Sequence, residues 1–468
     1  MSEVARDLFS TEAATDGLPP VQRAWAMLTY SVGLSMSVLD GNIANTALPA
    51  IAKQLHASPA ESIWVVNAFL LAVAICVVPF SSLVDIIGYK RVFQVGLAIF
   101  TAASVGCSLP HSLETLVLAR VIQGIGAACI WSSSAAMMRY TYPRALLGHG
   151  IGVGGIVVFT SAAAGPSIAS AILRIASWHW LFAINVPFGL ISLSLSERYL
   201  APAPGTRHRF DYWSAVLNAA TVTLLITGID GLGHTGHAKV VVAELLGAAL
   251  IGLLLVRRQL ALDVPMLAVD LFERPVFALS SAASFVTFMG QGLAFVVLPW
   301  YFIDGLGFSQ VMAGLLLTPW PIAAGATSHI AGRMADRYHL RLLGPAGMVG
   351  MTAGLVLLAT LPVHPAPFQI IWRAALGGAG FGFFGAPNNR AMLASASRER
   401  SGGVGGISTM SRLLGQSIGV AIVAVIFGLS EQGGASLHDA RLALLCGTIF
   451  TVGSALISRL PQPHLHPE

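Results

Sequence analysis

Four ionisable side chains lie inside long apolar stretches of this 468-residue chain: Asp40, Arg120, Arg373 and Arg412. An ionised group in such surroundings must be paired, protonated or exposed to a water-filled cavity, because its desolvation is costly. A carboxylate beside a cation can bind and release a proton, since low dielectric favours the protonated acid and the cation favours the ionised one. These residue types therefore point to ion pairing and proton exchange.

Asp40 and Arg120 are predicted to meet at similar depth. Asp40 lies about eleven residues from Ile51 and Arg120 about nine residues from His111, or ~16 and ~13 Å along a helix. We therefore assign both to proton coupling. The alternative is packing, in which Asp40 bonds neighbours such as Asn45 and Arg120 binds backbone carbonyls.

Fourteen apolar stretches position these side chains, and each is about long enough to cross a bilayer. The chain is 55% hydrophobic and only 10% charged, with a mean hydropathy of +0.75. A soluble domain usually has ~25% charged residues, so the composition indicates an all-α membrane protein with 14 transmembrane helices.

The basic residues are distributed unequally between the two sides of these stretches. With the N-terminus inside, 19 of the 26 Lys and Arg lie on the inner side, four outside and three within stretches. This bias predicts that both termini are cytoplasmic. It also explains the net charge of +5 without nucleic-acid binding. Residues 1–22 lack an apolar core, which predicts a cytoplasmic tail and not a cleaved signal peptide.

The chain repeats itself at an offset of about 250 residues, as transporters built from duplicated bundles do. The matches are Ala47-Leu48-Pro49 with Val297-Leu298-Pro299, Asp85 with Asp336, Arg120 with Arg373, and Gly165 with Gly415. Helices 1–6 therefore pair with helices 9–14, and helices 7 and 8 are an insertion. Parallel repeats of this kind predict a substrate site between two halves that rock. Arg373 and Arg412 have no carboxylate in their own half, so a structural role and a coupling role both stay open for them.

The repeat divides the chain into a six-helix bundle, a linker with two helices and a second six-helix bundle, flanked by cytoplasmic tails. The predicted bounds are 1–22 for the N-terminal tail, 23–198 for the first bundle, 199–260 for the linker, 261–460 for the second bundle and 461–468 for the C-terminal tail.

Motifs for hydrolysis, ATP use and metal binding are missing from the sequence. It has no GK[ST] phosphate loop, no HExxH and no GxSxG. Its four cysteines lie in apolar segments without paired spacing, which argues against disulfides and a metal site. We predict no enzyme activity, no cofactor and no metal.

Five segments, taken in order, resemble motifs of one transporter family. They are LDGNIANTALP at 39–49, SSLVDIIGYKR at 81–91, RVIQGIGAA at 120–128, GPSIAS at 165–170 and WHWLFAINVP at 178–187. Together they resemble the 14-helix drug:proton antiporters of the major facilitator superfamily, the Qac/Emr type of multidrug efflux protein. The resemblance covers residues 24–459.

The resemblance implies a proton-coupled exporter of small, lipophilic or cationic compounds in the inner membrane, with Asp40 at the family's acidic position. An antiporter for one metabolite or amino acid is the alternative. A receptor or channel is disfavoured, because the chain has no soluble module and no filter-type loops. The resemblance leaves a periplasmic adaptor open as a partner, and we expect a monomer.

Two further sets of residues are assigned from position and type. The gating residues are predicted in the equivalent loops after helices 2 and 10 and in the Gly-Pro segment of helix 5: Asp85, Gly88, Lys90, Arg91, Gly165, Pro166, Gly332, Asp336 and Arg337. An adaptable, mostly apolar substrate cavity is predicted from Asn42, Asn67, Phe69, Trp131, Phe288, Gln291 and Trp320. The alternatives are solvated loop charges and close helix packing for the first set, and lipid-facing aromatics for the second.

Overall fold

The structure is a computed structural model that describes residues 17–143, 146–202, 210–232, 238–262, 265–334, 340–395, 401–429 and 436–460. Within these ranges the regular structure is entirely helical. Asp336 and Arg337, two of the predicted gating residues, lie outside the described residues.

The first half of the molecule contains six membrane-spanning segments, three of them built from two consecutive helices. In chain order they are α2 (Pro20–Gln54), α3 (Pro59–Ser62) with α4 (Trp64–Ile87), α5 (Tyr89–Cys107), α6 (Leu113–Ser132) with α7 (Ser134–Thr141), α8 (Leu147–Ile175), and α9 (His179–Ala183) with α10 (Asn185–Tyr199). The inserted pair that follows is α11 (Tyr212–Gly231) and α12 (Ala238–Leu260).

The second half also contains six spans. After the short η3 (Val269–Glu273) come α13 (Pro275–Trp300) with η4 (Tyr301–Gly305), α14 (Gln310–Leu317) with α15 (Pro319–Met334), α16 (Leu340–Ala359), α17 (Pro367–Ala394), α18 (Ser401–Gly428) and α19 (Leu437–Arg459). Eleven spans among the described residues are both long and apolar enough to cross a membrane. The helices α2, α5 and α17, with 35, 19 and 28 residues, complete the fourteen that the sequence predicts.

The ends of several helices follow directly from local sequence. Ser58 and Glu61 form a reciprocal capping box at the start of α3, and Ser436 and Asp439 form another at the start of α19. Gly88 separates α4 from α5 with φ of 89°, a left-handed conformation that glycine adopts without strain.

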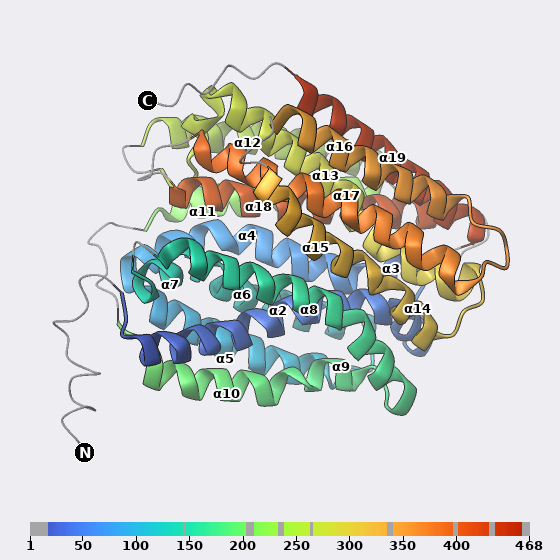
Figure 1. The fold of residues 1–468 in the computed structure, drawn as a ribbon, viewed down its shortest axis with the longest axis horizontal. Coiled ribbons are helices and arrows are strands. Elements are labelled where there is room, and N and C mark those ends of the chain that lie inside the picture. Colours follow the sequence, from blue (N-terminus) through green and yellow to red (C-terminus); the bar gives the residue numbers. More distant parts are fainter. Residues whose placement is uncertain are drawn as a thin grey trace.

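The helices of each half pack mainly with one another, and Figure 1 shows the two halves one above the other. In the first half α2 packs on α8 and α10, and α6 packs on α4 and α5. In the second half α13 packs on α18 and α19, and α17 packs on α15 and α16. The halves meet where α18 contacts α4, where α8 contacts α14 and α15, and where α2 contacts α13.

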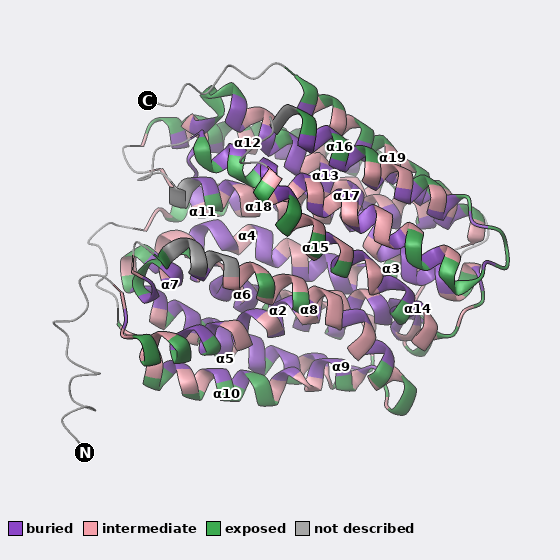
Figure 2. Cartoon of the chain, viewed as in Figure 1, coloured by how far each residue is buried: buried purple, intermediate pink, exposed green. Residues whose placement is uncertain are grey.

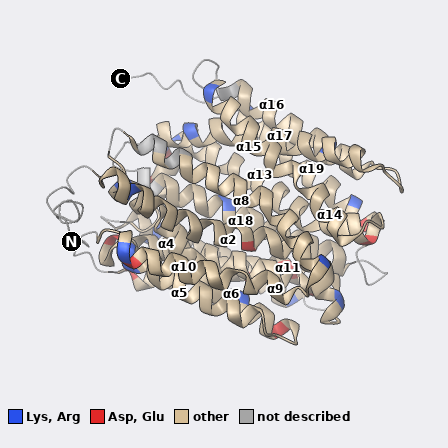
Figure 3. Cartoon of the chain, turned by 60° about the horizontal axis from the view of Figure 1, so that its bottom comes forward, with Lys and Arg blue, Asp and Glu red and all other residues tan. Residues whose placement is uncertain are grey.

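The two ends of the molecule can be named from the chain itself. We call the end where α2 begins and α19 ends the terminus end, and the opposite end, which holds the α2–α3 connection, the far end (Figure 1). Charged residues gather near both ends, and the band between them is almost free of charge (Figure 3).

The outward surface of the helices is largely apolar, unlike that of a soluble bundle. Buried residues line the helix contacts and exposed ones face outward (Figure 2). The outward face of α12 exposes large apolar side chains, including Leu246, Leu250 and Leu253, which are 66%, 61% and 50% exposed. An apolar face of this size is expected against lipid and not against water.

The inserted helix α11 is attached to α4 by side-chain hydrogen bonds. Pro79 lies inside α4 and has no N–H, so the carbonyl of Ile75 lacks its usual helical donor. Asn218 Nδ2 of α11 donates to that carbonyl at 2.9 Å. Nearer the far end, Trp64 Nε1 of α4 donates to Asp230 Oδ2 of α11 at 3.1 Å.

At the terminus end, polar side chains join α11 to α12. Asp211 caps α11, accepts from Ser214 Oγ at 2.5 Å, and pairs with Arg258 Nη2 at 3.0 Å. Partial burial acts to raise the pKa of Asp211, but the hydrogen bonds from Ser214 and Arg258 outweigh it and lower the pKa below its usual value. Gln259 Nε2 also donates to Ser214 Oγ, at 2.6 Å.

Candidate functional site

A buried polar cluster in the middle of the first half is centred on Asp40 of α2. Arg120 Nη1 of α6 forms an ion pair with Asp40 Oδ2, and both side chains are fully buried. Asp40 Oδ1 accepts from Gln123 Nε2 at 3.0 Å and from Asn185 Nδ2 of α10 at 2.8 Å. The carboxylate is therefore held by one cation and two amides from two other helices, and the predicted contact between Asp40 and Arg120 is confirmed.

Arg120 is fixed in place by contacts beyond Asp40. Its Nε donates to the carbonyl of Val65 on α4 at 2.9 Å, and Nη1 also donates to Gln123 Oε1 at 2.6 Å. The guanidinium carbon lies 4.3 Å from the ring centroid of Phe69 and 5.5 Å from that of Phe182. The backbone contact predicted as an alternative role for Arg120 thus occurs together with the ion pair.

The ion pair at the centre of this cluster acts as a lock between α2 and its neighbours α6 and α10. The charges of Asp40 and Arg120 compensate each other in a fully buried site, and a buried pair that loses one partner is destabilised by about 3–5 kcal/mol. Loss of either charge would therefore remove the electrostatic basis of the contacts that join these helices.

The sequence interpretation missed Gln123 and Asn185 and named a different neighbour for Asp40. Asn45 makes no contact of this kind, and its Oδ1 is buried without a hydrogen-bond partner. Gln123 lies in the segment 120–128 and Asn185 in the segment 178–187, both quoted above for their resemblance to family motifs. An amide inside an apolar helix marks both positions in the sequence, but it does not identify what the side chain contacts.

A second polar group lies at the contact between the two halves and centres on Arg412. Its guanidinium carbon is 4.0 Å from the ring centroid of Trp131 on α6. The indole of Trp131 is itself held by α2, because Nε1 donates to Ser37 Oγ at 2.8 Å. Arg412 from the second half thus rests on an aromatic side chain fixed by the first half.

Close backbone packing holds the helix that carries Arg412. A Cβ added at Gly415 would lie 2.4 Å from the carbonyl oxygen of Phe285, and one at Gly419 would lie 2.1 Å from that of Met289. Only glycine allows α18 to approach α13 so closely. One turn beyond Arg412, Gln416 Nε2 donates to Gln291 Oε1 of α13 at 3.3 Å.

The predicted cavity residues fall into different environments. Trp131 and Gln291 lie at the group around Arg412, and both are half-buried. Phe69 instead covers Arg120, and Phe288 packs edge-on against Phe381 with centroids 5.5 Å apart.

The remaining cavity candidates lie on α2, α4 and α15. Asn42 is half-buried and donates to the Val38 carbonyl of its own helix at 2.8 Å. Asn67 is buried with Oδ1 unpartnered. Trp320 is 1% exposed inside the second half, where Gly377 would meet its ring at 2.5 Å if it carried a Cβ.

Among the predicted gating residues of the α4–α5 connection, Lys90 is tied to its own half. Lys90 Nζ donates to the carbonyl of Glu197 at the end of α10, at 2.8 Å. Asp85 and Arg91 are exposed, and Gly88 is the glycine with positive φ between α4 and α5 that is described above. Gly332, in the corresponding part of the second half, would place a Cβ 4.0 Å from that of Ala386.

Gly165 and Pro166 of α8 lie where the halves meet toward the far end. A Cβ at Gly165 would be 2.8 Å from Cβ of Asn42, so α8 and α2 approach closely there. Gly314 of α14 fits against the Pro166 carbonyl, to which a Cβ would come within 2.5 Å.

Hydrogen bonds reinforce the contact of α8 with α14. The hydroxyls of Ser167 and Thr318 are 2.8 Å apart, and Ser170 Oγ donates to the Gln310 carbonyl at 3.3 Å. Within the described residues, these hydrogen bonds connect the two halves on the far-end side of the midpoint.

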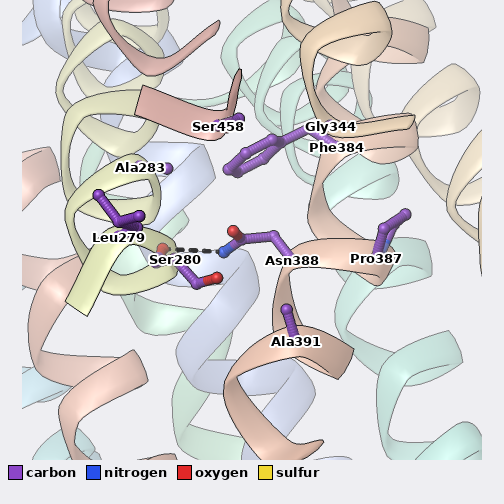
Figure 4. Close-up of a pocket in the computed structure, with 9 residues that line it drawn as sticks. All are labelled: Leu279, Ser280, Ala283, Gly344, Phe384, Pro387, Asn388, Ala391 and Ser458. Atoms are coloured by element: carbon purple, nitrogen blue, oxygen red, sulfur yellow. Dashed lines mark hydrogen bonds between the residues drawn. The ribbon is translucent and has the colours of Figure 1, made fainter. Parts of the chain in front are cut away.

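A small cavity lies inside the second half, between α13, α16, α17 and α19 (Figure 4). Its volume of about 20 Å³ leaves room for roughly one water molecule. Asn388 Nδ2 points across it and donates to the Ser280 carbonyl at 3.1 Å and to Ser284 Oγ at 2.7 Å. A drug-sized ligand needs roughly 300 Å³ or more, so this cavity is a packing feature.

Comparison with protein families gives one match, to the model described as Major Facilitator Superfamily, over residues 30–420 and 280–466. The chain is 48% identical over 452 residues to the uncharacterized transporter YebQ of Escherichia coli, covering 96% of this chain and 98% of that protein. It is 28% identical to the riboflavin transporter RibZ of Clostridioides difficile, covering 88% and 90%. It is 27% identical to the putative multidrug resistance protein MdtD of Salmonella heidelberg, covering 95% and 96%.

The fold is similar to a solved structure as well. A bacterial homologue of the human lysosomal transporter Spinster, in an inward-facing and unoccupied conformation, matches with a TM-score of 0.67. The match covers 94% of this chain and 97% of that one at 15% identity, which establishes similarity of fold.

Proposed function

Because the chain belongs to the Major Facilitator Superfamily, we propose that it is a proton-coupled exporter of small lipophilic compounds, cationic ones among them, that works by alternating access. The family consists of membrane carriers, so the chain is a transporter and not an enzyme. The proposal adds the driving ion, the direction of transport and the substrate class.

One observation carries the proposal: a fully buried carboxylate, Asp40, is paired with a fully buried arginine in the middle of a membrane helix. An intramembrane ion pair of this kind indicates a functional site. A proton that reaches Asp40 discharges it, breaks the pair with Arg120 and frees α2 to move against α6 and α10. Deprotonation reforms the lock.

The contacts between the halves support a carrier that is closed at the far end. The Ser167–Thr318 and Ser170–Gln310 contacts lie on that side of the midpoint. The excess of Lys and Arg at the terminus end makes that end cytoplasmic, with both termini inside a bacterial inner membrane. The described conformation is then inward-facing.

The orientation has a direct test. Ile87 is exposed at the terminus end and His111 is exposed at the far end. A cysteine at position 87 should react with an impermeant thiol reagent only in inverted vesicles, and one at position 111 only in intact cells. The reverse pattern would disprove the orientation.

The relatives support two substrate classes. MdtD is named a putative multidrug resistance protein, which favours a broad range of lipophilic compounds. RibZ is named a riboflavin transporter, which favours an antiporter for one metabolite. Export of chemically unrelated dyes by cells that express the protein would support the first class, and export of a single compound would support the second.

The coupling is tested with Asp40→Asn in proteoliposomes under an imposed pH gradient. The amide keeps the size and hydrogen-bonding capacity of the carboxyl but cannot titrate, so the variant should fold while gradient-driven transport falls to background. Thr46→Val is the matched control on the same helix, because the Thr46 hydroxyl donates to the Asn42 carbonyl of α2 at 3.2 Å. This variant should retain gradient dependence. Undiminished gradient-driven transport by Asp40→Asn would return Asp40 to a packing role.

A further inference from the structure

Arg412 is a cation near the middle of α18 for which the structure supplies no anion. Among the described residues, no carboxylate pairs with it and no hydrogen bond to its guanidinium is formed; its one polar interaction is with the Trp131 ring. Arg120, the buried arginine of α6, has Asp40. The positive charge at the contact between the halves is therefore uncompensated.

The stacking geometry leaves the donors of Arg412 available. A guanidinium that lies over an aromatic ring uses its face for that contact, while its N–H groups point outward in the plane. Arg412 also keeps partial exposure, unlike Arg120, which is fully buried. A planar anion can approach this edge and accept two parallel hydrogen bonds.

Neighbouring side chains complete a site that suits an amphipathic ligand. Gln416 lies on the same face of α18 one turn away, and its amide reaches Gln291 of α13. Trp131, positioned by Ser37, offers a large apolar surface from the opposite half. The site thus takes residues from both halves, as a carrier that opens to alternate sides requires.

We propose that Arg412 and Trp131 bind the anionic group of the transported compound, whose chemical class is an aromatic or apolar body that carries a carboxylate or sulfonate. The proposal rests on the proposed export function and restricts its lipophilic substrates to anionic ones, in place of the cationic ones included above. The bound anion neutralises Arg412, and the ligand is held by both halves at once. A cationic substrate would face repulsion at this position.

The test compares two dyes with the same xanthene ring system and opposite charge, fluorescein and rhodamine 123. Binding of each to the full-length protein in phosphatidylcholine nanodiscs is measured by fluorescence anisotropy. Fluorescein should bind the unmodified protein, and Arg412→Gln should weaken that binding at least about tenfold, the loss expected for one charge-assisted contact. Rhodamine 123 binding should not weaken in Arg412→Gln.

Two further variants and one lipid control test whether the loss of fluorescein binding comes from the charge of Arg412. Arg412→Lys keeps the charge and should retain part of the affinity. Arg373→Gln removes another arginine that lies near an aromatic ring, 5.2 Å from the centroid of Trp372, and should change fluorescein binding by less than about twofold. Phosphatidylglycerol in the nanodiscs should not compete with fluorescein, since the ligand is a solute and not a lipid headgroup.

Stability without ligand gives an independent readout. Arg412→Gln removes an uncompensated charge, so its thermal midpoint should equal or exceed that of the unmodified protein. A midpoint several degrees lower would show that Arg412 is a packing residue and would overturn the proposal. So would equal fluorescein affinity in the two proteins, or binding of rhodamine 123 without any binding of fluorescein.

The test of anion binding by Arg412 can succeed or fail independently of the proposed proton coupling by Asp40. Asp40→Asn should bind fluorescein normally while losing gradient-driven transport. If Asp40→Asn keeps gradient-driven transport, the coupling proposal fails and the binding result for Arg412 still stands.

Discussion

The two halves repeat one architecture but carry opposite charges at non-equivalent places. Asp40 in α2 corresponds, at the offset of 250, to Gly290 in α13, and Arg412 in α18 corresponds to Ala162 in α8. A small residue therefore stands at the position equivalent to Asp40 and at the position equivalent to Arg412, whereas Arg120 is matched by Arg373. The repeated scaffold therefore does not depend on the charges of Asp40 and Arg412. In the two proposals above, proton exchange rests on Asp40 of the first half, and anion binding rests on Arg412 of the second half with Trp131 of the first.

The halves also differ in how their helices are held together. The first half joins α2, α6 and α10 through the charged cluster around Asp40. The second half uses neutral groups in the corresponding region. Gly290 packs against Thr451 and Gly447 of α19, and hydroxyl pairs lie nearby, Thr287 with Ser454 at 2.7 Å and Thr352 with Thr451 at 2.6 Å. Protonation can thus loosen the first half without a corresponding effect on the second.

The strongest test of this difference removes the two arginines that the repeat makes equivalent. Arg120→Ala leaves Asp40 buried and unpaired, which should lower the free energy of unfolding by about 3–5 kcal/mol. Arg373→Ala removes a side chain whose Nε and Nη1 have no hydrogen-bond partner, so its effect should stay within about 1 kcal/mol. Thermal or denaturant unfolding in detergent measures both.

The double variant Asp40→Asn with Arg120→Ala identifies the cause. It removes both charges, so it should be more stable than Arg120→Ala alone if the loss comes from the unpaired carboxylate. Equal effects of Arg120→Ala and Arg373→Ala would show that the first half does not depend on its ion pair.

A smaller effect is expected from the glycine contact of the second half. Gly419→Ala places a Cβ against the Met289 carbonyl, where the backbone must move, and should destabilise by about 1–3 kcal/mol. Gly406→Ala, on the same helix, meets no atom within 4 Å and should be neutral or slightly stabilising. A thermal-unfolding assay of the two variants measures both changes in stability. Equal behaviour of the pair would mean that α18 does not rely on backbone contact with α13.

Much of this arrangement could be predicted from the chain, because lipid imposes strong constraints on sequence. The lengths of the apolar stretches predicted the spanning segments. The estimated depths of Asp40 and Arg120 along their helices predicted that the two side chains meet. The uncharged hydrogen-bond partners of Asp40 could not be predicted. An amide such as Gln123 or Asn185 has the same local sequence signature whether it faces lipid, a cavity or a carboxylate.

The contact of Arg412 with Trp131 was also beyond prediction. It joins residues 281 positions apart, on helices of opposite halves, and depends on how the halves are rotated against each other. The roles of Asp85, Lys90 and the other gating residues stay predictions, since their loops are described in one conformation.

The smallest expected effect concerns the inserted helix α11, which contacts both halves but has its described side-chain hydrogen bonds to α4 of the first half. Asn218→Ala would leave the Ile75 carbonyl without a donor, because Pro79 cannot supply one, and should destabilise by about 1 kcal/mol. Thr221→Val is the control, since its hydroxyl donates to the Leu217 carbonyl of its own helix, which keeps its backbone donor. Indistinguishable thermal midpoints for the two variants would mean that the Asn218 hydrogen bond adds nothing to the attachment of α11 to α4. The hydrogen bond from Trp64 of α4 to Asp230 of α11 would then remain as a polar contact that ties the insertion to the first half.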